Sequence, residues 1–87
     1  MATAVSKYKY NPQDFVNMPS LSEDLSEFYS RLELYESEKT KAAYMDLTYF
    51  WWEVLFFTIK HREVEGNIAP HNADDVRNYL EGLIYAS

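Results

Sequence analysis

The sequence predicts an all-α fold: a small three-helix bundle with an additional short N-terminal helical turn and an extended N-terminal arm. Three observations predict it. One segment repeats apolar residues at helical spacing, the next is apolar around most of its circumference, and neither glycine nor proline occurs between residues 20 and 65. With 87 residues the chain has room for one domain, which we place over residues 1–87.

The N-terminal region is predicted to hold an arm over residues 1–10, which lack a helical period, and a short helix over residues 11–18. Asn11 can cap that helix, Pro12 suits its first position, and Asp14 is placed to reach back to the cap. The arm either faces a partner or folds its tyrosines back onto the bundle.

The first long helix is predicted over residues 20–38. Ser20 and Glu23 have the spacing of a capping box at its start. The polar stretch over residues 36–41 predicts a loop or a kink after it. The apolar residues of this helix are spaced 4, 3, 4 and 3 apart, as on one helical face: Leu21, Leu25, Phe28, Leu32 and Tyr35.

The central helix is predicted over residues 41–65 and is unusually apolar. Through its middle, the only strongly polar residues are Asp46 and Glu53. Lys39 and Lys60 continue their spacing of seven, so the four polar residues trace one narrow stripe. A helix with so little polar surface belongs at the centre of a bundle.

The third helix is predicted over residues 73–85, after Gly66 has ended the central helix. Asn72 is the expected cap, with Asp75 three residues further on. Its expected buried stripe consists of Val76, Tyr79, Leu80, Leu83 and Ile84.

The composition argues against several classes of protein. The chain has no cysteine, which excludes a disulfide scaffold or a cysteine nucleophile, and two glycines are too few for a phosphate-binding loop. Its formal net charge of −6 disfavours nucleic acid and anionic membranes as partners. No apolar run approaches the roughly 20 residues of a spanning helix, and we find no signal peptide, so we expect a cytoplasmic protein without membrane contact.

Candidates for chemistry are few. Asp46 and Glu53 could act as a carboxylate pair, but a solvated edge of a buried helix explains them as well, so we expect a protein that is not an enzyme. A histidine near a helix end or in a polar loop needs no metal, and we expect neither metal nor cofactor. The residues that could be drawn as a metal site are His61, Glu65, His71 and Asp75.

The charge of the first helix marks a candidate surface. Residues 23–38 contain six acids and one base, Arg31. This pattern indicates either a solvated helix face or a docking surface for a basic partner, including mimicry of nucleic-acid phosphates. Glu27, Glu33 and Glu36 are the candidate contacts.

The high aromatic content, 17% of the residues, marks a second candidate surface. On a regular helical wheel Phe50 and Phe57 share a side with the polar stripe, and three helices cannot enclose the central helix completely. We therefore predict that Phe50, Trp52 and Phe57 contact a partner, unless the N-terminal turn and arm cover them.

These observations lead us to expect a non-enzymatic protein–protein interaction module that binds one protein partner through acidic and aromatic surface. In being small, acidic, aromatic and helical, the chain is similar to phage-type antagonists, immunity proteins and antitoxins, which implies an inhibitor or an adaptor. Three alternatives stay open: a homodimer or larger homo-oligomer that buries the aromatic residues, a nucleic-acid mimic, and a small enzyme using Asp46 and Glu53.

Overall fold

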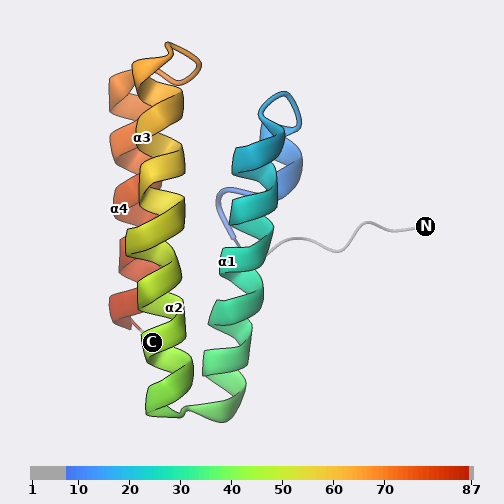
Figure 1. The fold of residues 1–87 in the computed structure, drawn as a ribbon, viewed down its shortest axis with the longest axis vertical. Helices are drawn as coiled ribbons and strands as arrows, with labels where there is room; N and C mark the ends of the chain where they lie inside the picture. The colour runs from blue at the N-terminus through green and yellow to red at the C-terminus, as the bar shows by residue number, and fades with distance from the viewer. Residues whose placement is uncertain (1–7, 87) are drawn as a thin grey trace, which may run out of the picture.

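The computed structural model describes residues 8–86, and the statements below refer to that part of the chain. It is mainly helical, without a strand among those residues, and α1 packs along α2 while α4 packs along α3 (Figure 1). The predicted all-α bundle is confirmed. The elements are the 3-10 helix η1 (Pro12–Phe15), α1 (Pro19–Glu38), α2 (Lys41–Phe50), the π-helical turn η2 (Trp51–Leu55), α3 (Phe56–Val64) and α4 (Pro70–Ala86).

The central helix is one continuous rod made of α2, η2 and α3 (Figure 1). Its buried residues follow one another in steps of four: Ala43, Leu47, Trp51, Leu55 and Ile59. In an α-helix of 3.6 residues per turn, each step of four overshoots by about 40°, so such a series would wind away from the core. A π turn holds one residue more and rotates everything after it back by about 100°. The π turn therefore keeps this series facing the core.

The start of α1 differs from the prediction. Pro19 is its first residue, Met18 precedes it as N-cap, and the expected capping box of Ser20 and Glu23 is wrong because both residues already lie inside the helix. Proline is favoured at the first helical position, where its missing N–H costs nothing. The predicted apolar face is confirmed, with Leu21, Leu25, Phe28 and Leu32 buried and Tyr35 half-buried.

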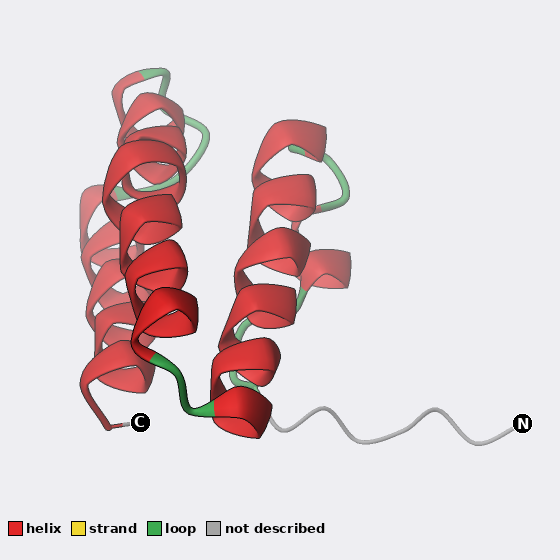
Figure 2. Cartoon of the chain, turned by 60° about the horizontal axis from the view of Figure 1, so that its bottom comes forward, coloured by secondary structure: helices red, strands yellow, loops and turns green. Residues whose placement is uncertain are grey.

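A two-residue loop connects α1 to α2, at the end of the bundle that Figure 2 brings forward. Lys39 adopts the left-handed conformation with φ of 57°, and its N–H donates to the Tyr35 carbonyl. Thr40 then caps α2, because its hydroxyl accepts a bond of 3.1 Å from the Ala43 N–H. The alternatives of loop or kink are thus resolved as a loop, although the capping role of Thr40 was not anticipated.

The start of α4 also differs from the prediction. The helix begins at Pro70, and the Ala73 N–H already bonds to the Ala69 carbonyl, so Asn72 lies inside the first turn and is not the cap. The favoured place of proline again explains the shift. Gly66, with φ of 83°, follows the end of the central helix as predicted.

The N-terminal turn is shorter than predicted. The 3-10 helix covers four residues, Pro12–Phe15, and the Asp14 carboxylate reaches back to accept from the Asn11 N–H at 3.0 Å, as predicted. Phe15 and Met18 are buried in the common core, and the Ser22 hydroxyl donates to the Pro12 carbonyl at 2.9 Å. The turn is therefore packed on α1 and forms part of the bundle.

Candidate interaction surface

One face of the central helix leaves large apolar side chains in solvent. We call it the outer face and define it by Met45, Tyr49, Trp52 and Phe57. Their exposed fractions are 58%, 66%, 42% and 59% respectively. Core residues of the same rod, such as Leu55, are completely buried, so the helix has one covered side and one open side.

Contacts with α1 define one flank of the central helix. The Arg31 Nε lies 3.3 Å from an Asp46 carboxylate oxygen, and the Thr58 hydroxyl donates to Asp24 at 2.6 Å. Arg31 also places its guanidinium 4.4 Å from the centre of the Phe50 ring. This flank is polar and closed by α1.

Contacts with α4 define the opposite flank. The Trp51 indole N–H donates to Glu81 at 3.3 Å, and Arg77 pairs with Glu63 at 3.0 Å. Arg77 also lies 5.6 Å from the centre of the Phe56 ring. The outer face lies between the two flanks, on the side that neither α1 nor α4 covers.

The aromatic residues of the outer face are joined to the core. Trp52 lies against Phe56 with ring centres 5.3 Å apart, and Phe56 lies 5.9 Å from Phe57. Trp52 also meets the buried Trp51 edge-on at 6.2 Å. Trp52 therefore contacts a fully buried ring directly, and Phe57 is linked to the same ring through Phe56.

The prediction that Phe50 and Phe57 share a side is wrong. Phe50 is half-buried beneath Arg31 on the α1 flank, whereas Phe57 is exposed on the outer face. The regular wheel assumes a constant turn, and the π turn between the two residues breaks that assumption. Sequence reasoning also missed Met45 and Tyr49, although their spacing of seven and three residues from Trp52 was a usable signal.

The structure does not gather the acidic candidates of α1 on the outer face. Glu27 pairs with Arg31, towards the flank that meets α2. Glu33 accepts from the Tyr8 hydroxyl at 3.3 Å, on the flank that meets the N-terminal segment, and Glu36 is exposed near the end of the helix. These acids are spread around α1, so an acidic and an aromatic contact would be two separate surfaces.

The carboxylates considered for catalysis have separate environments. Asp46 is held by Arg31, and Glu53 is exposed in the π turn. Among the described residues, no group of three metal-ligating side chains comes together. His61 lies 3.0 Å from Glu65, four residues on in the chain.

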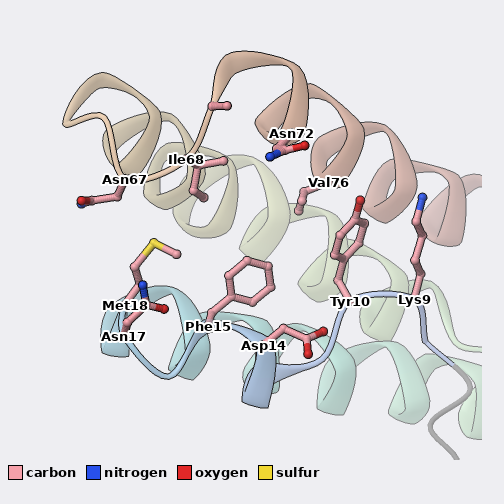
Figure 3. Close-up of a pocket in the computed structure, with 11 residues that line it drawn as sticks. Lys9, Tyr10, Asp14, Phe15, Asn17, Met18, Asn67, Ile68, Asn72 and Val76 are labelled. Atoms are coloured by element: carbon pink, nitrogen blue, oxygen red, sulfur yellow. The ribbon is translucent and has the colours of Figure 1, made fainter.

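A pocket of about 540 Å³ lies between the N-terminal segment and the start of α4 (Figure 3). Its charged groups already have partners within the fold: Lys9 pairs with Asp75 at 3.0 Å, and Asp14 caps η1. Its apolar lining consists of Phe15, Met18, Ile68, Ala69 and Val76, and its amides are those of Asn17, Asn67 and Asn72. Neither Asp46 nor Glu53 lines it.

The described part of the N-terminal arm folds back onto α1 and α4. The Tyr8 ring stacks on Tyr29 at 3.8 Å, the Tyr29 hydroxyl donates to the Tyr10 carbonyl, and the Lys9 N–H donates to the Tyr79 hydroxyl at 2.8 Å. Burial raises the pKa of the Tyr29 phenol. Residues 8–10 therefore do not cover the outer face, and residues 1–7 of the predicted arm lie outside the described residues.

Asp75 ties the same segment to α4. It accepts hydrogen bonds from the Tyr10 hydroxyl and from the Lys9 ammonium. These bonds lower the pKa of the Asp75 carboxyl and raise the pKa of the Tyr10 phenol. The Asp75 carboxylate considered for a metal site is thus used to hold the N-terminal segment.

Comparison of the chain with protein families, with curated proteins and with solved structures gave no match. Within residues 8–86, no helix has both the length and the apolar character needed to cross a membrane. The geometry of the surfaces is therefore the basis for a functional proposal.

Proposed function

We propose that this protein is a non-enzymatic interaction module of the cytoplasm, an inhibitor or adaptor that binds one protein partner through its outer face. The single observation that carries the proposal is the row of exposed apolar side chains on the central helix: Met45, Tyr49, Trp52 and Phe57. Tryptophan and tyrosine are the side chains that most often dominate binding energy in interfaces.

The size of the outer face supports this proposal. At about 200 Å² for a whole side chain, the exposed fractions of its four residues leave roughly 450 Å² of largely apolar surface. Continuous patches of about 300–600 Å² on a monomer are often functional. With its polar surroundings, such a patch can form the centre of an interface of roughly 800 Å² per partner.

The alternatives receive less support. A nucleic-acid mimic requires a concentrated array of carboxylates, whereas Glu27 and Glu33 lie on different flanks of α1. A small enzyme requires Asp46 and Glu53 to act together, and Asp46 is engaged by Arg31. A homo-oligomer would use the same outer face, so light scattering over a range of concentrations separates it from a monomeric binder.

The test of the proposal is the loss of one exposed ring. Phe57→Ser should weaken partner binding by a factor of about 5 to 30, because a buried aromatic anchor is worth about 1–2 kcal/mol. The matched control is Val16→Ser, since Val16 is 72% exposed and lies at the end of η1. A partner captured from native lysate by the unaltered chain and by Val16→Ser should be lost with Phe57→Ser. Equal retention by all three proteins would refute the proposal.

A further inference from the structure

The outer face has the shape of a narrow stripe along the helix axis. Met45, Tyr49 and Trp52 follow at intervals of four and three residues, and the π turn brings Phe57 back onto the same side. At 1.5 Å per residue, the stripe from Met45 to Phe57 is about 18 Å long. A straight apolar stripe of this kind matches the apolar stripe of another helix, as in coiled-coil zippers.

The cations of the described residues fall into three groups. Most are compensated within the fold, because a carboxylate lies within 4 Å: these are Lys9, Arg31, Arg62 and Arg77. Lys39 lies over the Tyr35 ring in the loop before α2. Lys41 and Lys60 are exposed on the central helix, and neither forms an ion pair within residues 8–86.

These two lysines precede and follow the four residues that define the outer face. They are 19 residues apart, or about 28 Å along the rod. In an uninterrupted α-helix Lys60 would point about 100° further round than Lys41, and the extra residue of the π turn removes this difference. Lys41 and Lys60 therefore lie in line, one before Met45 and one after Phe57, and the exposed Val64 continues the same side beyond Lys60.

The charge along the outer face differs from that of the whole chain. Between the two lysines the exposed acids are Asp46, which Arg31 compensates, and Glu53. The side chains of residues 41–60 thus carry no net charge, although the whole chain carries −6, and their two positive charges lie before Met45 and after Phe57. A partner that fits this face must be apolar in its middle and acidic at its ends.

Building on the proposed function, we infer that the outer face binds an amphipathic helix of the partner protein, about 20 residues long, with carboxylates near both ends that meet Lys41 and Lys60. This differs from the basic partner expected from the acids of α1. Those acids lie on other sides of the molecule. The charges nearest the exposed rings therefore decide which charges the partner helix should carry at its ends.

Two synthetic probes test the inference. Both are labelled 20-residue helical peptides with the same leucine stripe, one with glutamates at both ends and the other with lysines. Fluorescence anisotropy at low salt should show the glutamate-ended peptide binding at least ten-fold more tightly, with the difference shrinking as salt is added. The double variant Lys41→Glu with Lys60→Glu should reverse the preference, and the control Lys39→Glu, which keeps both lysines of the central helix, should reduce it without reversing it.

Outcomes for the inference and for the proposed function can be distinguished. Equal binding of the two peptides, or tighter binding of the lysine-ended one, overturns the inference. If Phe57→Ser still weakens the binding of both peptides in that case, the outer face remains a binding surface and the proposed function stands. If Phe57→Ser alters the binding of neither peptide, both the inference and the outer-face proposal fail. Melting curves of the variants should match the unaltered chain, since the substituted side chains are exposed.

Discussion

Arg31 shows how one side chain can decide which aromatic residue reaches the surface. Its guanidinium lies over the Phe50 ring and contacts carboxylates of both α1 and α2. An arginine over an aromatic face contributes about 0.5–2 kcal/mol and keeps water from that ring. No cation covers Phe57 in this way among the described residues, and Phe57 stays exposed.

Substitution of a buried residue of the central helix should destabilise the fold, unlike substitution of the exposed Phe57. Leu55 is completely buried in the π turn, so Leu55→Ala should cost about 2–5 kcal/mol of unfolding free energy. In a domain of this size that corresponds to a fall in Tm of roughly 10 °C or more, measured by circular dichroism. Met45→Ala, an exposed control on the same helix, should change the unfolding free energy by about 0.5 kcal/mol or less. An unchanged Tm for Leu55→Ala would contradict the orientation of the central helix.

At the scale of elements, the π turn makes the central helix unusual. The rod contains one residue more than an α-helix would need to connect its two halves in phase. Deleting Glu53, which is exposed, should convert the turn to α-helix and leave Leu55 and Ile59 facing the core. Inserting one alanine after Glu53 should rotate α3 by about 100° out of phase with the core.

The two changes should therefore have unequal effects on stability. The deletion should stay within about 1 kcal/mol of the unaltered chain, because core burial is kept. The insertion should cost several kcal/mol, because it turns Ile59 away from the core. Thermal unfolding of both variants provides the comparison, and equal losses would show that the extra residue is not what keeps the helix in phase.

Much of this architecture could be predicted from the sequence, since apolar spacing is a direct signal of helices. The face from Leu21 to Leu32 and the start of the central helix at Lys41 were predicted correctly. The caps at Ser20 and Asn72 were wrong, because a nearby proline at the first helical position competes with a capping side chain.

The candidate surface was predicted less completely than the fold. Trp52 and Phe57 are exposed as expected, but Phe50 was grouped with them because a helical wheel assumes a constant turn. The π turn depends on how the whole series of core residues packs against two neighbouring helices, and no single residue type marks it. The roles of these residues in binding stay predictions.

At the scale of the whole molecule, charged groups join the N-terminal segment to the bundle. The pKa of Asp75 is lowered in the folded protein, so its hydrogen bonds stabilise the fold above about pH 3.9, the ordinary pKa of an aspartate. This contribution to stability is lost as the pH falls below that value. The raised pKa of Tyr10 means that its contribution is present below about pH 10 and is lost as the pH rises beyond it.

The N-terminal segment should therefore detach at both extremes of pH. The amide resonance of Lys9, whose N–H donates to Tyr79, should move towards its unfolded position at acidic and alkaline pH while the core helices persist. An NMR titration measures this. Asp75→Asn should weaken the attachment at neutral pH and remove most of its acid transition. An identical acid transition in Asp75→Asn would show that another carboxyl controls the segment.

The adjacent positions of Trp51 and Trp52 give the molecule two optical reporters of different kinds. Trp51 is completely buried and Trp52 is 42% exposed, although they are neighbours in the chain. A water-soluble quencher such as iodide has access to the fluorescence of Trp52 alone in the folded protein. The shielded fraction of the emission therefore reports folding, and the accessible fraction reports whether anything occupies the outer face. Each indole, kept singly by replacing the other with phenylalanine, would allow the two signals to be followed without any attached dye.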